Sequence, residues 1–337
     1  MMSLFNYQHF NATLLYKRRG DAMSEVKVNH SQRFGIILVL SCGIMWGVSG
    51  VLGQYVFQSS DVNAVQLSII RQFISGVVLL IIAAIKRDKK ALSVWSKPKS
   101  IISMLFFALA GVMGVQFTYF ASIEHSNAAT GTVIQFTYII MILLFTTIFM
   151  HKKPHSYEAL SVICAFVGIF LIATHGSLNS LAISRPALTW GLTSAVCFTI
   201  YCLYPQKLYN EYGLINVIGW SSLIAAIFLA VITRTFSLPY MDARIIAASL
   251  AVAVVGSLIP FTIYGLGISI LGSVKASLFV TVEPVSSALL TWIFLGTRFT
   301  RMDMIGFLLI LGSIQVVAVM TFRNERHIVK AEQTHIS

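Results

Sequence analysis

Apolar stretches of membrane-spanning length recur along the chain and are separated by short polar loops. A helix rises 1.5 Å per residue and needs about 20 apolar residues to cross a hydrocarbon layer of about 30 Å. The pattern therefore predicts an all-α integral membrane protein with about ten transmembrane helices. The expected spans lie roughly at 34–57, 65–85, 100–122, 127–150, 157–174, 187–206, 214–233, 245–267, 275–295 and 303–322.

The apolar pattern occurs twice along the chain. A shift of about 145 residues places Tyr119 over Tyr264 and residues 129–133 over residues 274–278. A long apolar run, a short cationic loop and a glycine-containing apolar run follow in both copies. Duplicated membrane halves are typical of secondary transporters.

The duplication predicts two five-helix repeats flanked by polar tails. The expected divisions are an N-terminal tail over 1–33, a first repeat over 34–177, a second over 186–322 and a C-terminal tail over 323–337. Met23 is an alternative start, because codons for the preceding residues 17–20 can resemble a purine-rich ribosome-binding sequence; an ordinary tail is the other interpretation. The first apolar segment is too long and too far along the chain for a cleavable signal.

Composition excludes a soluble domain and sets the expected orientation. The chain is 57% hydrophobic and 11% charged, with a mean hydropathy of +0.81, so the lipid bilayer is its first partner. Cationic loops near membrane segments stay in the cytoplasm. The protein is therefore expected in a bacterial inner membrane with both termini on the cytoplasmic side. This orientation leaves few cationic residues on the outer side: Arg185, Arg234, Arg244, Arg298 and Arg301.

Several function classes are disfavoured by the sequence. The net charge of +12 is divided among short loops without a continuous basic face, which argues against nucleic-acid binding. The four cysteines lie within predicted spans without metal-type spacing, so we expect no metal and no cofactor. A GxxxxGK[ST] loop is missing from the sequence, which therefore contains no ATP-driven motor of that type. The spans also lack the carboxylate or histidine clusters that a membrane enzyme needs.

Specific motifs appear in the second repeat and in the first helix. They are Gly43-Ile44-Met45-Trp46-Gly47, Leu271-Gly272-Ser273-Val274-Lys275-Ala276-Ser277, Glu283-Pro284-Val285, Leu290-Thr291-Trp292-Ile293-Phe294-Leu295-Gly296 and Gly306-Phe307-Leu308-Leu309-Ile310-Leu311-Gly312. Together with the helix that carries Arg71, they resemble EamA-type members of the drug/metabolite transporter superfamily over residues 34–322. The resemblance implies two inverted five-helix repeats around a central cavity and a secondary carrier, commonly an exporter.

The chain departs from the family pattern at a few positions. Thr297 stands where a Glu usually follows the Leu-Gly pair, and the first half has His151-Lys152 in place of that pair. Ile139 occupies the position that Pro284 has in the second repeat. A mechanism that relies on those family residues is therefore not expected here.

Two charged residues within the spans are candidates for function. Glu283 is the only acidic residue deep inside a predicted span, where an unpaired charge costs several kcal/mol. It could carry a proton or meet a cationic substrate group, or be held structurally beside Pro284. Arg71 could clamp a substrate carboxylate, or its long side chain could reach back to the interface.

Aromatic and amide groups deep in the spans also need polar partners, which a cavity supplies. We therefore expect Trp46, Gln135, Tyr138, Tyr201 and Tyr264 to join Arg71 and Glu283 in contacting substrate.

The expected function is export of a small metabolite, amino acid or drug-like compound by alternating access, with Glu283 as the candidate for proton coupling. Import and facilitated diffusion are alternatives that fit the same helices. A polytopic membrane enzyme and a sensor subunit are further alternatives with less support in the residues.

Overall fold

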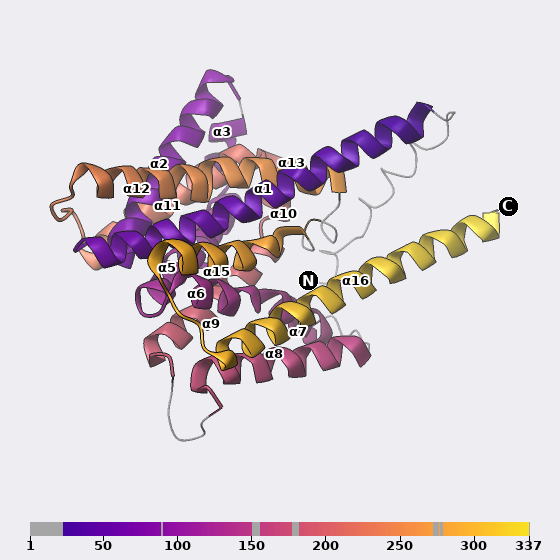
Figure 1. Ribbon diagram of the computed structural model, residues 1–337. Coiled ribbons are helices and arrows are strands. Elements are labelled where there is room, and N and C mark those ends of the chain that lie inside the picture. Colours follow the sequence, from indigo (N-terminus) through magenta and orange to yellow (C-terminus); the bar gives the residue numbers. More distant parts are fainter. Residues whose placement is uncertain are drawn as a thin grey trace.

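Helices make up the regular elements in the part of the chain that the structure describes (Figure 1). The structure, a computed structural model, describes residues 23–88, 90–149, 156–176, 182–271, 276 and 279–336. An all-helical protein is what the apolar sequence predicts, because a backbone in hydrocarbon must satisfy its hydrogen bonds within its own segment.

The helices before residue 177 are α1 (Met23–Ser59), α2 (Ala64–Ile85), α3 (Lys90–Ser93), η3 (Val94–Ser96), α4 (Pro98–Phe106), η4 (Phe107–Met113), α5 (Gly114–Glu124), α6 (Ala128–Phe136), α7 (Tyr138–Phe149) and α8 (Ser156–Thr174). Those after residue 182 are α9 (Arg185–Leu203), α10 (Gln206–Tyr212), α11 (Leu214–Thr233), α12 (Ala243–Ala253), η5 (Val254–Leu258), α13 (Ile259–Leu271), α15 (Val282–Leu295) and α16 (Arg301–Ile336).

Seven stretches of the described chain are long and apolar enough to cross a membrane, which confirms the membrane class. They are Gln32–Ser59, Ala64–Ile85, Pro98–Glu124, Ser156–Thr174, Arg185–Leu203, Leu214–Thr233 and Ala243–Gly267. Two shorter apolar helices cover Ala128–Ile142 and Val282–Leu295. These nine stretches coincide with predicted spans, and the span expected at 303–322 lies within the longer helix α16.

Both predicted tails are partly helical. Helix α1 begins at Met23, within the tail expected over residues 1–33, and α16 continues to Ile336 through the tail expected over 323–337. In Figure 1, α1 and α16 extend beyond the rest of the bundle on the same side. The length of an apolar stretch determines how much of the chain can lie in the membrane, but it does not determine where the helix ends. Intrahelical hydrogen bonds can continue beyond the apolar stretch into water.

Two long spans contain a widened helical turn at equivalent places in the two halves. The segment η4 joins α4 to α5, and η5 joins α12 to α13; both are π-helical. Gly111 of η4 and Gly256 of η5 lie 145 positions apart in the sequence. A π turn shifts hydrogen bonds from i→i+4 to i→i+5, releases a backbone carbonyl and is frequent at functional sites.

Two other spans are interrupted rather than widened. Thr137 separates α6 from α7 within the predicted span 127–150. Thr281 precedes α15 within the predicted span 275–295, so that Glu283 lies in the first turn of a new helix. Pro284 fits this position, because the first turn of a helix does not need its N–H groups for intrahelical bonds.

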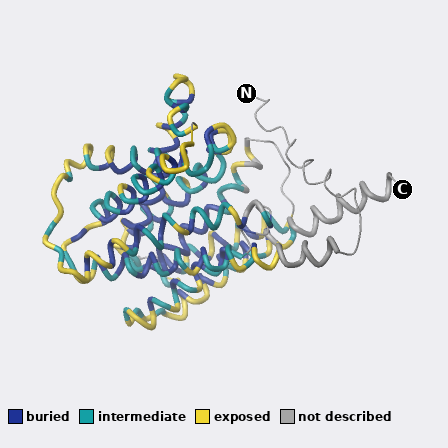
Figure 2. Tube along the Cα trace, turned by 90° about the horizontal axis from the view of Figure 1, so that it is seen from above, coloured by how far each residue is buried: buried dark blue, intermediate teal, exposed yellow. Residues whose placement is uncertain are grey.

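Helices from the two halves pack against each other throughout the bundle. The closest partners include α2 with α11, α5 with α9, α8 with α16, and α1 with both α13 and α15. Gly47 of α1 permits the close approach of α1 and α15. A Cβ at this position would lie only 3.0 Å from the Ser287 backbone nitrogen and would push the two helices apart. Buried positions lie mainly where helices face one another, and exposed ones on outer faces and connecting turns (Figure 2). Residues from both halves therefore meet at the centre.

Candidate functional site

A narrow cavity of about 70 Å³ lies where the two halves meet, with room for a few water molecules. Its lining combines charged, amide and aromatic side chains. The lining residues are Trp46, Ser49, Arg71, Val115, Gln116, Tyr119, Gln135, Phe136, Tyr138, Phe198, Tyr201, Cys202, Phe261, Tyr264, Val280 and Glu283.

The seven candidate residues from the sequence all line this cavity, although they come from seven different helices. Four belong to helices of the first half and three to helices of the second half. The full set, in the order α1, α2, α6, α7, α9, α13 and α15, is Trp46, Arg71, Gln135, Tyr138, Tyr201, Tyr264 and Glu283. The structure brings these seven side chains together around one cavity. Their contact with a substrate stays a prediction.

Arg71 is buried, with 5% of its surface exposed. Its Nη2 donates to the Gly256 carbonyl oxygen at 2.6 Å, and its Nε donates to Ser257 Oγ at 2.6 Å. The guanidinium also lies over the Phe120 ring, with Cζ 5.2 Å from the ring centroid. The side chain is therefore directed into the bundle, and the alternative in which it reaches the membrane interface is not what the structure adopts.

The Gly256 carbonyl is the point where α1 and α2 both contact η5. Trp46 Nε1 donates to this oxygen at 2.9 Å, alongside the bond from Arg71. A Cβ on Gly256 would lie 2.2 Å from Ser49 Oγ and 3.3 Å from Arg71 Cζ. The close approach of both helices thus depends on a residue without a side chain and on a carbonyl available in a π-helical turn.

Glu283 is the acidic residue of the cavity, and 6% of its surface is exposed. Its charge interacts electrostatically with Arg71. The ion pairs in the described part of the chain are Lys97 with Glu211 and His175 with Asp303, so Glu283 and Arg71 do not form an ion pair with each other. The hydrogen bonds within that part include none to the Glu283 carboxylate, which leaves this group available to a solute in the cavity.

Aromatic rings surround the charged groups. Trp46 lies against Tyr264 and Phe261, with ring centroids 5.3 Å and 5.6 Å apart. Tyr201 stacks on Phe198 at 5.5 Å with an interplanar angle of 16°. Such rings form apolar walls, and their faces also attract cations.

Amide side chains supply the remaining polar lining. Gln135 Nε2 donates to Ser194 Oγ at 2.6 Å, which fixes the side chain of α6 against α9. Gln116 Oε1 is buried without a hydrogen-bond partner in the described structure. A solute in the cavity could therefore donate a hydrogen bond to Gln116.

Sequence reasoning missed several lining residues, among them Gln116, Tyr119, Phe198, Cys202 and Phe261. Helical spacing was the available signal. Phe261 lies three positions before Tyr264, and residues three or four apart share one face of a helix. The same spacing relates Phe198 to Tyr201.

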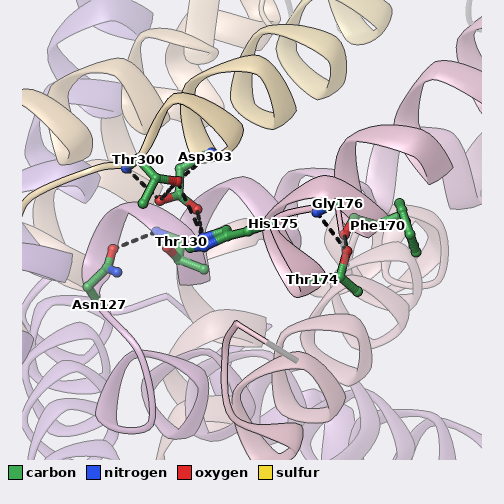
Figure 3. A network of polar contacts seen from close by, with 8 residues as sticks. All are labelled: Asn127, Thr130, Phe170, Thr174, His175, Gly176, Thr300 and Asp303. Atoms are coloured by element: carbon green, nitrogen blue, oxygen red, sulfur yellow. Dashed lines mark hydrogen bonds and ion pairs between the residues drawn. The ribbon is translucent and has the colours of Figure 1, made fainter. Parts of the chain in front are cut away.

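A second polar cluster joins α8 to α16 outside the cavity (Figure 3). His175 Nε2 lies 3.0 Å from Asp303 Oδ1, and Asp303 is largely buried. Thr300 caps α16, because its Oγ1 accepts from the Asp303 backbone N–H at 3.2 Å. The Thr300 backbone nitrogen and hydroxyl in turn each donate to Asp303 Oδ2 at 2.8 Å. This cluster ties the last turn of α8 to the first turn of α16.

A third polar cluster joins the segment after α2 to α10 and α11. Lys97 Nζ donates to Glu211 Oε1 at 2.7 Å, which lowers the pKa of Glu211 and raises that of Lys97. The Lys90 backbone N–H and the Asn216 amide donate to Asp88 and lower its pKa.

Metal-binding groups are not found in the described residues, which contain no cluster of three or more His, Cys, Asp or Glu side chains able to hold an ion. The arrangement at the centre is instead a small polar cavity with aromatic walls and two opposite charges, surrounded by membrane-length helices. It can bind a small solute through charge, hydrogen bonds and ring contacts.

Comparison with known proteins assigns this architecture to a family. The model of the EamA-like transporter family matches residues 33–174 and again residues 185–319. The uncharacterized inner membrane transporter YicL of Salmonella typhimurium is 34% identical over 297 residues, which cover 88% of this chain and 99% of YicL. The threonine/homoserine exporter RhtA of the same species is 22% identical over 228 residues, covering 67% of this chain and 74% of RhtA.

A protein of known crystal structure, 17% identical in sequence, superposes with a TM-score of 0.59 over 86% of this chain and 98% of its own length, which indicates the same fold. Because one family model matches both halves and a relative is 34% identical over nearly its whole length, the chain belongs to the EamA-like transporter family and is a membrane transporter rather than an enzyme.

Proposed function

We propose that the protein exports a small zwitterionic metabolite of the amino-acid type across a bacterial inner membrane. One observation carries the proposal: Glu283 and Arg71 line the same buried cavity without forming an ion pair with each other. A substrate ammonium group would meet the Glu283 carboxylate. The carboxylate of the substrate would accept hydrogen bonds from Arg71. The guanidinium carries five N–H donors, and some of them remain free after the bonds to Gly256 and Ser257.

The names of two relatives support this substrate class and location. RhtA is a threonine/homoserine exporter, and threonine and homoserine are zwitterions with a hydroxyl group. YicL is named an inner membrane transporter. The Gln116 oxygen and the tyrosine hydroxyls around the cavity would suit such a hydroxyl group.

The transport cycle would use two inverted five-helix repeats, over 34–177 and 186–322, with both termini in the cytoplasm. The equivalent π turns η4 and η5 and the interruptions at Thr137 and Thr281 support an internal repeat. The pairs α2 with α11, α6 with α15, and α8 with α16 unite equivalent positions of the two halves, as a two-fold relation would require.

Alternating access would open one end of the cavity at a time. The cluster of Lys97 with Glu211 joins the halves at the start of α4 and at α10. The cluster of His175 with Asp303 joins them at the end of α8 and the start of α16, which would lie at the other end of the cavity. The cavity is too narrow for a solute much larger than water, so this conformation would correspond to a closed stage. Either end would open by separating its polar cluster.

Glu283 would couple export to protons. A carboxylate in a dry cavity is costly, so it would bind either the substrate ammonium group or a proton, but not both. Competition between the two at one carboxylate would exchange a substrate molecule for a proton, because the carrier would change its open end only with one of them bound to Glu283.

The test is untargeted mass spectrometry of the medium from cells that overproduce the protein, Glu283→Gln, Asp61→Asn or an empty vector. We expect a zwitterionic compound outside cells with the unmodified protein and with the control Asp61→Asn, whose carboxylate is exposed and is not part of the cavity lining or of either polar cluster. Glu283→Gln should resemble the vector. Equal accumulation with Glu283→Gln would contradict a coupling role, and depletion of the compound from the medium would favour import.

A further inference from the structure

An apolar groove of about 510 Å³ runs along the outer surface between α15 and α16. Its floor is formed by Val133 of α6, Pro284 and Phe307, all of which are buried. Its walls are exposed or half-buried apolar side chains of the two helices and of the segment that joins them. The wall residues are Val285, Ala288, Leu289, Trp292, Phe299, Met304, Leu308 and Leu311.

The groove exists because α16 packs along α8 and leaves its other face uncovered. Leu308, on this open face, is 69% exposed, and Trp292 across the groove is 59% exposed. Both helices lie in apolar stretches of a membrane protein, so the groove faces lipid rather than water.

Two arginines stand at one end of the groove. Arg298 directly precedes Phe299, which lines the groove, and Arg301 begins α16. Met304 and Leu308 follow Arg301 at three and seven positions, a spacing that places all three on one face of the helix. The open face of α16 thus changes from cationic to apolar within one turn.

Neither arginine is neutralised within the described chain. Arg298 and Arg301 are exposed and take no part in the ion pairs found there. Asp303, the acidic residue of the same turn, is buried and paired with His175, which directly follows α8 (Figure 3). Two exposed arginines therefore place positive charge at this end of the groove.

The groove has the length of one lipid chain. From Arg301 to Leu311 the helix advances about 15 Å, at 1.5 Å per residue, which is half of a hydrocarbon layer of about 30 Å. An occupant with its polar group at the arginines would therefore extend its tail to about the bilayer centre.

We propose that this groove is a binding site for one phospholipid with an anionic head group, whose phosphate meets Arg298 and Arg301 and whose acyl chain lies along α15 and α16. Charge complementarity separates it from a second apolar groove on the other side of α15, lined by Val48, Leu52 and Phe294 among others. The chain that follows α1 at that groove carries the acidic residue Asp61 and no arginine, so that groove would not select an anionic lipid.

Native mass spectrometry of the purified full-length protein tests the site. The protein is titrated with phosphatidylglycerol or with phosphatidylethanolamine of the same acyl chains. We expect the unmodified protein to retain the anionic lipid at least several-fold more strongly. The double variant Arg298→Gln with Arg301→Gln should lose about tenfold in affinity for it, because each cation near a lipid head group contributes to binding.

Matched variants control for charge and shape. Arg234→Gln with Arg244→Gln removes the same charge from two other exposed arginines and should leave the lipid preference unchanged. Ala288→Phe narrows this groove and should reduce lipid retention, whereas Val48→Phe narrows the second groove and should not.

Equal retention of the two lipids by the unmodified protein would overturn the proposal. It would be overturned equally if the Arg298 and Arg301 double variant kept the preference in full. Should that double variant fail to fold, the comparison of lipids on the unmodified protein and the effect of Ala288→Phe still decide the question.

Discussion

Arg71 on α2 and Gly256 in η5 are joined by a 2.6 Å hydrogen bond from the guanidinium to a backbone carbonyl. The two residues belong to different halves of the chain, 185 positions apart. The bond holds a positive charge at the wall of the cavity and simultaneously fixes the widened turn of the helix that supplies the carbonyl. Substitution of either residue should therefore disturb both the cavity and the contact between the halves.

Gly256→Ala should destabilise the protein, because its Cβ would overlap Ser49 Oγ at 2.2 Å and crowd the Arg71 guanidinium. We expect a loss of about 1–3 kcal/mol, as for other overpacked sites. Gly312→Ala is the matched control, since nothing lies within 4 Å of a Cβ there and α16 gains a better helix former. Thermal unfolding of both variants in detergent measures the difference, and equal unfolding temperatures would contradict the crowding at Gly256.

Arg71→Lys should weaken substrate binding while keeping the positive charge. A lysine has one nitrogen in place of the planar fork, so it cannot hold Gly256 and Ser257 and also meet a substrate carboxylate. Loss of one hydrogen bond to a charged group corresponds to about 1.5–3 kcal/mol, or at least a tenfold rise in the substrate concentration for half-maximal transport.

The measurement is the initial rate of export at graded internal substrate concentrations, with Arg87→Lys as the control at an exposed arginine directly after α2. Unchanged half-saturation with Arg71→Lys would show that the guanidinium does not contact the substrate.

The sequence was sufficient to predict seven of the side chains that gather at the cavity. Charged, amide and phenolic groups deep in a span need a polar environment, and in a helical bundle that environment is the interior, so Glu283, Arg71 and Gln135 could be placed there without coordinates. The prediction of an all-helical membrane protein rests on the same physics, because length and hydropathy alone identify a spanning helix.

The backbone features of the cavity could not be predicted in the same way. A π turn such as η5 differs from an α turn only by hydrogen bonds shifted from i→i+4 to i→i+5, and its glycine and small residues also occur in ordinary packed helices. The interruption at Thr137 has no proline beside it to mark it, whereas Pro284 marked the equivalent position in the second half. The pairing of His175 with Asp303 joins residues 128 positions apart and depends on the tertiary arrangement.

Lys97→Met should lower the unfolding temperature by no more than about 2 °C at neutral pH, because an exposed ion pair contributes little to stability. The pH dependence of this small effect follows from the pKa directions. Glu211 has a lowered pKa, so its contribution is present above the ordinary carboxyl pKa and is lost on acidification through the lowered value. Lys97 has a raised pKa, so its contribution is lost only as the pH rises through that higher value.

The difference between the unmodified protein and Lys97→Met should therefore be constant from about pH 5 to pH 10 and should shrink below about pH 4. Unfolding in detergent at graded pH measures it. A difference that grows on acidification would contradict the pairing with Glu211.

Asp303→Asn should destabilise the contact between α8 and α16 through loss of the ion pair with His175, since the amide oxygen can still accept the capping bonds from Thr300. We expect a cost of about 1–2 kcal/mol for a charged hydrogen bond at a largely buried carboxylate. Asp242→Asn is the control, because Asp242 caps α12 through Ile245 without an ion pair in the described structure. It should change the unfolding temperature little.

A double-mutant cycle with His175→Gln separates the ion pair from the helix cap. If the pair acts as a unit, Asp303→Asn should cost much less once His175 has been replaced, and the coupling energy should be about 0.5–2 kcal/mol. If Asp303 acts only by accepting the hydrogen bonds from Thr300, the effects of the two substitutions on the free energy of unfolding should be additive, because those bonds do not involve the imidazole. The additivity of the two unfolding free energies therefore decides whether the α8 and α16 contact is held by charge or by the cap alone.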